Sequence, residues 1–538
     1  MRPARPTQPA RSARKVAVRI LFAAVVVPVV AGAFMLQSRD TRDSARLFSE
    51  VFSLVTSRFA DTLDMATLYE KAARGLVQQL NDPYAALYTP KQLRDFTANT
   101  GGRYAGVGMY VEEQDDDVVV SRVFPNTPAA EAGVLEGDRI IAIDSSSTAR
   151  WALDRVSEAL KGAPGTPVAV TFERAGLARP VRSRFTRAVI HIPAVPYAVM
   201  LDGGIGYVPL VQFNETASAE VRAAVARLAR EGARGFILDV RGNGGGIVDE
   251  ALEISNLFLQ PGQTIMSTRG RGQKPQSFIA RERPLIPAAP LVVLTDGGSA
   301  SATEIVAGAL QDHDRALVVG TTSFGKGLEQ SVFQLEGGYA LKMTTAKWFT
   351  PNGRSIHRER KLVDGRLVEE RPDSLEADSA KLSRPLFRSD AGRTVYGGGG
   401  ITPDVTVRPD TLTSAEQAFV RAVGPRSQQV YLALYRYALE LRPRVQPGFA
   451  ATPEWRDEFY RRLRASGVGV DRATYDAAAP YVNNLLENRV ARFAFGDSTA
   501  KRRTVSDDAA LRRALTLLHT GQTQRDLFAI ARRGPDGT

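Results

Sequence analysis

A serine-containing turn is the part of this sequence best suited to covalent chemistry. The apolar run LVVLT at 291–295 is typical of a buried strand, and the glycine-containing turn at 296–298 follows it. The helix-like segment SATEIVAGALQD begins at Ser301. A serine between a strand and a helix exposes its hydroxyl beside the unpaired N–H groups of the helix N-terminus. This position suits a nucleophile, although Ser299 or Ser301 could equally act only as an N-cap.

A lysine lies between two glycines after the next strand-like run. ALVVG at 316–320 predicts a buried strand, and Lys326 follows within the sequence SFGKG. A lysine held in a desolvated site loses its charge more readily, and a neutral amine can act as a general base. Serine and lysine together form an activated-nucleophile pair that needs no histidine.

A glycine-rich turn, RGNGGG at 241–246, follows the strand-like run GFILDV and precedes a helix-like segment. Glycines let backbone N–H groups approach a developing oxyanion closely. A tight turn or a phosphate-binding loop would be the alternative. However, the stretch lacks both the GxxxxGK[ST] order of a nucleotide loop and the GxGxxG order of a dinucleotide turn.

In combination these motifs resemble those of the C-terminal processing peptidases, also called tail-specific proteases. That family has a serine motif similar to SASASE, then a helix, then FGKGxxQ. The matching stretches here are SASATE at 299–304, in which Thr303 replaces the usual serine, and FGKGLEQ at 324–330. The resemblance implies that Ser301 is the nucleophile, Lys326 the general base and Gln330 the residue that orients the lysine amine. It also implies that the oxyanion donors are Gly245, Gly246 and the N–H of Ala302.

Two acidic residues, Glu304 and Asp312, also match positions of the family motif. Glu304 is three residues from Ser301, so the two side chains share one face of a helix. Asp312 is displaced by about 16 Å along a continuous helix, at about 1.5 Å per residue. We therefore expect Asp312 to be structural and the catalytic group to be a dyad.

A smaller module over residues 104–187 resembles a PDZ domain. Its strand-like runs are DVVVSRVF, RIIAI and VAVTFER, and a helix-like segment, WALDRVSEALKG, lies between the last two. The resemblance implies that this module accepts a C-terminal peptide as an added strand and binds its carboxylate through backbone N–H groups. The residues that match the carboxylate-binding loop are Tyr104, Ala105, Gly106, Val107 and Gly108.

The strand–helix alternation over 188–260 and 290–350 predicts an α/β domain. With the resemblance, it implies a crotonase/Clp-protease-like α/β catalytic core at 188–408 with a PDZ-like β domain inserted at 100–187. Helices are expected over 41–99, an exposed loop over 358–398, and a helical C-terminal extension of unknown role over 409–538.

The composition excludes several kinds of site. The chain of 538 residues contains no cysteine, which rules out a thiolate nucleophile, a disulfide framework and a cysteine-ligated zinc site. Its histidines, His191, His313, His357 and His519, show neither HxH nor HxxxH spacing, so we expect no metal and no cofactor. Much of the net charge of +12 lies in the basic segment 1–39, so a nucleic-acid partner is not expected.

The same N-terminal segment contains a targeting signal. Residues 1–15 form a basic tail, and residues 16–36 are almost wholly apolar and long enough to cross a bilayer. Basic residues before such a segment keep the tail cytoplasmic. The segment is either an anchor or a signal peptide cleaved near the small residues 31–33. We expect the rest of the chain in the periplasm, at the bacterial inner membrane or released from it. Expected partners are proteins with free C-termini, while a homo-oligomer or an adaptor protein remains open.

Three other functions compete with this interpretation. A catalytically silent PDZ scaffold would not need the intact serine, lysine and glycine motifs. A Ser-His-Asp hydrolase would need His313 or His357, but His313 lies three helical turns beyond Ser301, and His357 has no evident aspartate partner. A penicillin-binding SxxK enzyme would need a lysine three residues after a serine of these motifs, and none is present.

Overall fold

The computed structural model of the chain describes residues 44–114, 117–174, 177–272, 274–358, 361–363, 366–368 and 384–533. The chain forms two compact units, Met1–Leu80 and Asn81–Thr538. The first contains a helix over 44–58 and α2 (Met65–Gln78). The N-cap of α2 is Asp64, whose carboxylate accepts the Thr67 N–H at 2.8 Å. The apolar segment 16–36 lies outside the described residues. No helix within the described part is long and apolar enough to cross a membrane.

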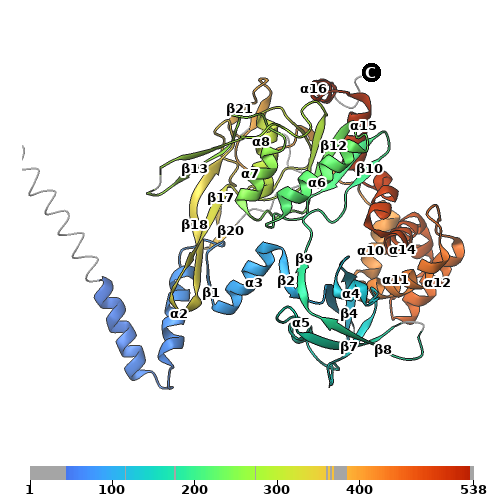
Figure 1. Cartoon of the computed structure of the whole chain (residues 1–538), viewed down its shortest axis with the longest axis horizontal. Helices are drawn as coiled ribbons and strands as arrows, with labels where there is room; N and C mark the ends of the chain where they lie inside the picture. The colour runs from blue at the N-terminus through green and yellow to red at the C-terminus, as the bar shows by residue number, and fades with distance from the viewer. Residues whose placement is uncertain are drawn as a thin grey trace, which may run out of the picture. The chain divides into compact units, whose positions relative to one another are not determined.

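In the second unit, a β domain corresponds to the PDZ-like module of the sequence (Figure 1). Its strands pair in the order β3-β4-β5-β7-β8, with β6 beside β5. Alternate residues such as Val168, Val170 and Phe172 point into its core. The elements are β3 (Met109–Gln114), β4 (Asp117–Val123), α4 (Pro128–Glu131), β5 (Arg139–Ile143), β6 (Ser146–Ser147), α5 (Leu153–Leu160), β7 (Pro167–Glu173) and β8 (Val181–Thr186).

A six-stranded sheet forms the centre of the region that the sequence predicts to be catalytic, in the order β10-β11-β12-β15-β16-β23. All neighbours are parallel except β10 and β11. Both faces are covered, which explains why β12, β15 and β16 are nearly continuous apolar runs. The mixed α/β fold agrees with the prediction. The strands are β10 (Val199–Leu201), β11 (Ile205–Pro209), β12 (Gly235–Asp239), β15 (Leu291–Thr295), β16 (Leu317–Gly320) and β23 (Val405–Thr406).

Helices cover the central sheet on two sides. One side packs against α6 (Ala217–Arg230), α7 (Val248–Asn256) and α8 (Ala302–Asp312). The other packs against α15 (Ala509–Thr520) and α16 (Gln524–Arg532), which come from the end of the chain (Figure 1). The last helices of the predicted C-terminal extension therefore belong to the layers of the catalytic region.

A second, antiparallel sheet contains β1 (Ala86–Tyr88), β13 (Thr264–Gly270), β14 (Gln276–Ile279), β17 (Leu328–Gln334) and β18 (Ala340–Phe349). Two elements flank the β domain: α3 (Pro90–Gly101) and the pair β2 (Arg103–Gly106) and β9 (Ala188–His191). Within the expected loop at 358–398, the structure describes the short hairpins β19 (Lys361–Val363) with β20 (Arg366–Val368), and β21 (Leu386–Arg388) with β22 (Thr394–Tyr396).

The earlier part of the C-terminal region is a helical body with its own core, in which Phe419, Phe459 and Tyr475 are fully buried. The hydroxyl of Tyr435 donates to the Val120 carbonyl of the β domain at 2.9 Å. The helices are α10 (Ser414–Val423), α11 (Ser427–Leu441), α12 (Pro453–Ala465), α13 (Arg472–Ala477) and α14 (Ala479–Arg503).

Candidate active site

Three turns that leave adjacent parallel strands form the candidate site. The glycine turn follows β12, the serine turn follows β15, and the lysine turn follows β16, and these three strands are neighbours in the sheet. Because parallel strands end at the same edge, the three motifs meet there although they are far apart in the sequence.

Ser301 precedes the first residue of α8 and has φ 59° and ψ −116°. A non-glycine residue with positive φ costs conformational energy, and such backbone is common at functional sites. The N–H of Glu304 donates to the Ser301 carbonyl oxygen at 2.8 Å. Ser299 is instead structural, since its hydroxyl donates to the Val240 carbonyl at 2.9 Å.

The glycine turn packs directly against the serine turn. Asn243 is fully buried, and its carbonyl accepts the Ala300 N–H at 3.0 Å and the Thr303 hydroxyl at 2.9 Å. A Cβ added to Gly245 would lie 2.9 Å from Ser301 Cβ and 3.0 Å from the Ala302 nitrogen. The Gly245 N–H donates to Asn243 Oδ1 at 2.9 Å. The sequence did not single out Asn243, which joins the two turns.

Gly246 contacts a different neighbour, because it pairs with Phe213 in an isolated parallel bridge. A Cβ added there would lie 2.2 Å from the Phe213 carbonyl oxygen. The two glycines that the sequence treats alike therefore face different parts of the structure.

Lys326 is half-buried in the turn after β16. Its Nζ lies 4.2 Å from the centroid of the Tyr84 ring, and its carbonyl accepts the Trp348 Nε1–H at 3.1 Å. A cation over an aromatic face is stabilised by the ring quadrupole. Tyr84, which lies before β1, is a further neighbour that the motifs did not indicate.

One buried carboxylate connects the serine and lysine turns. Glu304 has no exposed surface, and its Oε2 accepts both the Ser301 N–H and the Lys326 N–H at 2.8 Å. Its Oε1 accepts the Ser323 hydroxyl at 2.5 Å and the Gly325 N–H at 2.7 Å. Burial raises the pKa of Glu304, and these hydrogen bonds partly oppose the increase.

Comparison with known proteins shows the family of the chain. Residues 204–364 match the model of peptidase family S41, and residues 119–174 match a PDZ domain. A carboxy-terminal-processing protease of Bartonella bacilliformis is 37% identical over 323 residues, covering 59% of this chain and 74% of the relative. The chain belongs to the carboxy-terminal processing proteases of family S41. It is therefore a serine-type protease with a PDZ domain.

Other relatives of the protease share most of this length. The carboxy-terminal processing protease CtpA of Bacillus subtilis is 30% identical, covering 70% of this chain and 82% of the relative. Among solved structures, a photosystem II D1 C-terminal processing protease is 27% identical and covers 68% of this chain and 88% of that one, with a TM-score of 0.36.

Two further predicted residues of the protease, Gln330 and Asp312, have other neighbours. Gln330 is on β17, where its Nε2 lies 3.5 Å from the Thr344 hydroxyl of β18. Asp312 is at the opposite end of α8, in a fully buried ion pair of 2.7 Å with Arg354. Asp312 therefore has a buried basic partner, Arg354.

The two histidines of the rival hydrolase hypothesis have other neighbours. His313 caps the C-terminal end of α8, and its Nδ1 lies 2.7 Å from Asp390 while its Nε2 lies 2.7 Å from the Thr264 carbonyl. The His-Asp pair is thus at the wrong end of the helix for Ser301. His357 packs against Gly327, beside the lysine turn.

A groove of about 510 Å³ runs along β3 in the PDZ domain of the protease. Its walls come from β3, α5 and α3, and Lys91 of α3 pairs with Glu158 of α5 at 2.7 Å. Tyr104 and Val107 line the groove, and burial raises the pKa of Tyr104 to about 12. The carbonyls of Val107 and Gly108 accept the N–H groups of Ala129 and Phe124. Tyr104, Ala105 and Gly106 belong to β2, so only part of the expected loop is a loop.

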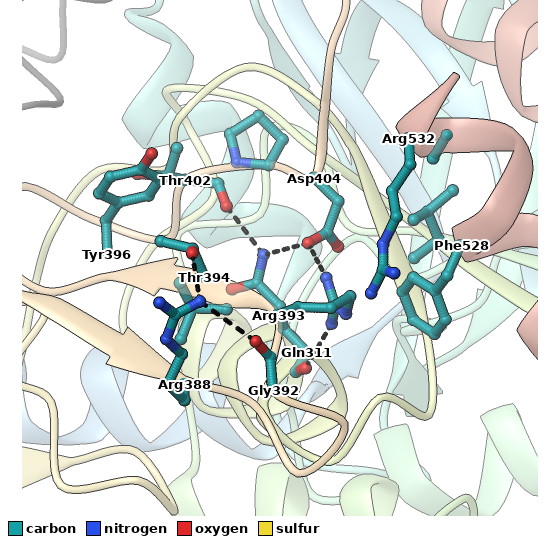
Figure 2. Close-up of a pocket in the computed structure, with 14 residues that line it drawn as sticks. Gln311, Arg388, Gly392, Arg393, Thr394, Tyr396, Thr402, Asp404, Phe528 and Arg532 are labelled. Carbon is teal, nitrogen blue, oxygen red and sulfur yellow. Dashed lines mark hydrogen bonds and ion pairs between the residues drawn. The ribbon is translucent and has the colours of Figure 1, made fainter. Parts of the chain in front are cut away.

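A separate cavity of about 500 Å³ lies between α16 and the β21–β22 hairpin (Figure 2). Arg393 occupies its centre, paired with Asp314 and Asp404, and its guanidinium lies 4.0 Å from the centroid of Phe528. None of the predicted site residues lines this cavity. The contacts of Arg393 in this cavity attach α16 to the catalytic region.

Replacing Glu304 with glutamine tests whether the buried carboxylate organises the site. Three backbone N–H groups and one hydroxyl donate to the two carboxylate oxygens of Glu304. In the glutamine variant an NH2 group replaces one of these oxygens, so whichever way the amide is turned, its N–H groups face other donors. We expect the free energy of unfolding to fall by about 1–3 kcal/mol, and kcat by about 100-fold. Gln311, on the same helix, cannot serve as the control position, because it is buried and its amide donates to the Thr402 carbonyl oxygen. Glu253→Gln on α7 provides a control outside the network, and equal kcat in both variants would contradict the prediction.

Proposed function

We propose that the chain is an endopeptidase that cleaves through an acyl-enzyme formed on Ser301. Neutral Lys326 takes the proton of the Ser301 hydroxyl as its oxygen attacks the scissile carbonyl carbon. The resulting lysine ammonium gives that proton to the leaving amine as the peptide C–N bond breaks. Water then attacks the ester, and the acid product leaves while the Ser301 hydroxyl is restored.

The observation that supports this mechanism best is the shared contact of Glu304 Oε2 with the backbone of Ser301 and Lys326. One oxygen that accepts both N–H groups at 2.8 Å fixes the two residues side by side. The Ala302 nitrogen and the glycine turn lie next to Ser301, where an oxyanion would form. These contacts hold the main chain of the dyad before substrate binds.

The proposed substrates are proteins whose free C-terminal tails bind the PDZ domain. Strand β3 is at the end of its sheet, so its outer edge can pair with an added peptide strand. The groove beside it is lined by charged residues of α3 and α5 together with Val107, Met109 and Leu160, which offer apolar contacts to tail side chains. A carboxylate would bind backbone N–H groups near 105–108.

This substrate preference can be tested with one reporter in two forms. We expect the full chain to cleave an unfolded protein with a free carboxylate and an apolar tail at least about 10-fold faster than its amidated counterpart, because a lost charge-assisted contact costs about 1.5–3 kcal/mol. Cleavage rates at substrate concentrations below KM measure the difference.

A groove variant provides the matched comparison. Ser157 lines the groove on α5, whereas Ser146 is exposed on β6 and does not line it. Ser157→Trp, which fills the groove without adding charge, is expected to remove the preference for the free carboxylate, and Ser146→Trp to retain it. A full preference in Ser157→Trp would mean that tails are recognised elsewhere.

We extend the proposal to location from the sequence alone. The apolar segment 16–36 and the basic tail before it would direct the catalytic region to the outer side of the bacterial inner membrane. A protease accessibility assay on intact and permeabilised cells distinguishes the two sides, and degradation only after full lysis would contradict this location.

A further inference from the structure

One side chain from the C-terminal region contacts the glycine turn of the candidate active site. Asp508 is the N-cap of α15, and its Oδ1 accepts the Leu511 N–H at 3.1 Å. The same carboxylate accepts two hydrogen bonds of 2.8 Å from the guanidinium of Arg241. This bidentate pair joins residues 267 positions apart.

Arg241 is the first residue of the RGNGGG turn, and it is held from two sides. Its guanidinium also donates to both carboxylate oxygens of Asp239, at 2.9 and 2.6 Å. Asp239 ends β12 and accepts the Tyr207 hydroxyl at 2.6 Å. Asp239 thus ties Arg241 to the strand before the turn, and Asp508 ties it to the C-terminal helices.

The charge balance of this cluster favours the ionised pair. Lys501, in the last turn of α14, donates to Asp508 Oδ2 at 3.0 Å. Burial alone would raise the pKa of Asp508, but the hydrogen bonds from Arg241 and the charges of Arg241 and Lys501 lower it well below its ordinary value. Asp508 and Arg241 are both less than a quarter exposed, so the pair is poorly screened by solvent.

The turn transmits the position of Arg241 to the nucleophile over four residues. The next residue, Gly242, donates its N–H to Asp296 Oδ1 at 2.8 Å, and Gly245 then lies against Ser301 Cβ and the Ala302 nitrogen. Since oxyanion donors must be placed to a fraction of an ångström, a shift of Arg241 would displace them.

We propose that Asp508 is a positioning residue for peptide cleavage, acting through Arg241 to hold the glycine turn against Ser301. This rests on the proposed function of Ser301 and Lys326. It gives the C-terminal region a role in catalysis: α15 covers the sheet and also fixes the turn that binds the oxyanion. Asp508 itself is not expected to contact substrate.

The test measures kcat and KM separately for the full chain on a short amidated peptide, so that tail recognition does not contribute. Asp508→Asn removes the charge at nearly constant size. We expect kcat to fall about 10-fold, within the about 100-fold cost of a 1 Å misplacement. KM should change by less than about twofold, because the substitution does not alter the contacts that bind the peptide before it reacts.

The control variant is Glu487→Gln, which breaks a comparable partly buried ion pair within the C-terminal region. Glu487 pairs with Arg503 at 3.0 Å, and its side chain is 23% exposed against 17% for Asp508. We expect it to keep the wild-type kcat. An equal loss of kcat in both variants, or an increase of KM alone in Asp508→Asn, would overturn the proposal.

A double variant shows whether the effect passes through Arg241. Arg241→Lys loses the bidentate geometry, and adding Asp508→Asn should then lower kcat by no more than about twofold further. If the two substitutions instead lowered kcat independently, so that their fold-losses multiplied in the double variant, the proposal would be overturned. If Asp508→Asn does not fold, Asp508→Glu replaces it, because this variant keeps the charge but moves the carboxylate outward by one methylene. It should lower kcat about threefold, and wild-type kcat would overturn the proposal.

A parallel assay distinguishes failure of the positioning role of Asp508 from failure of the proposed Ser301 mechanism. Ser301→Ala is assayed in parallel, and activity that persists in that variant would contradict the Ser301 mechanism itself. Activity that depends on Ser301 but is unchanged in Asp508→Asn would overturn only the positioning role.

Discussion

Replacing Lys326 with arginine is expected to reduce proteolysis by about 100- to 10,000-fold, the typical contribution of a general base. A guanidinium cannot lose its proton near neutral pH, so it cannot accept the proton of the Ser301 hydroxyl. Much of the side-chain length remains, so the guanidinium can take the place of Nζ, which lies 4.2 Å from the centroid of the Tyr84 ring in the native chain. Lys326→Arg therefore removes the base while altering its surroundings little.

Ser301→Ala should give a loss at least as large, about 10,000-fold or more, because nucleophile and base act as a unit. For the same reason the double variant should be no less active than the worse single variant. Turnover of a chromogenic peptide and thermal unfolding are the measurements. Unchanged melting temperatures would show that the loss is chemical.

Lys347→Arg is a matched control on β18, where the lysine is exposed. It should retain full activity. Substantial proteolysis by Lys326→Arg would exclude Lys326 as the base, and a catalytically silent scaffold would show no Ser301-dependent cleavage even in the wild-type chain.

The sequence predicted those parts of the site that depend on local order. Ser301 and Lys326 each follow a short apolar run, and the runs proved to be the adjacent strands β15 and β16. The glycine turn follows β12, which pairs with β15. Apolar runs separated by helical patterns are enough to predict parallel strands whose ends meet.

Contacts between distant residues were not predictable in this way. Glu304 was expected beside Ser301 because of its helical spacing, but nothing in that spacing indicates that its carboxylate also holds the lysine turn. Asp508 appears in the sequence as one more acidic residue of a helical region, and only packing of α15 on the sheet brings it to Arg241. The expected carboxylate loop is partly strand β2, because its partner β9 lies more than eighty residues later.

The different contacts of the two glycines in the oxyanion turn were likewise not predictable from the sequence. These contacts lead to the second prediction with a large expected effect on kcat. By sequence Gly245 and Gly246 are equivalent. In the structure, a Cβ at Gly245 would meet the serine turn, at 2.7 Å from the Ala300 oxygen, whereas a Cβ at Gly246 would meet the Phe213 backbone at 2.2 Å. Contacts below 3.0 Å force one side to move.

Gly245→Ala should therefore move the turn away from Ser301 and lower kcat by about 100- to 1000-fold, the usual cost of losing an oxyanion donor. Its positive φ of 97° adds a strain of about 1–2 kcal/mol, which lowers the melting temperature only moderately. Gly246→Ala should instead lose stability as well as activity, because the bridge to Phe213 and the hydrogen bond from the Ile247 N–H to the Phe213 carbonyl must shift.

Gly242→Ala separates backbone strain from the contact with Ser301. Gly242 also has a positive φ, 67°, but a Cβ there would meet no atom within 4 Å. We expect this variant to lose a similar amount of stability to Gly245→Ala while keeping most of its kcat. If Gly242→Ala and Gly245→Ala had equal kcat, the close approach of Gly245 to Ser301 would serve packing and would not be required for cleavage. A selective loss in Gly245→Ala would instead show that this approach is required for cleavage.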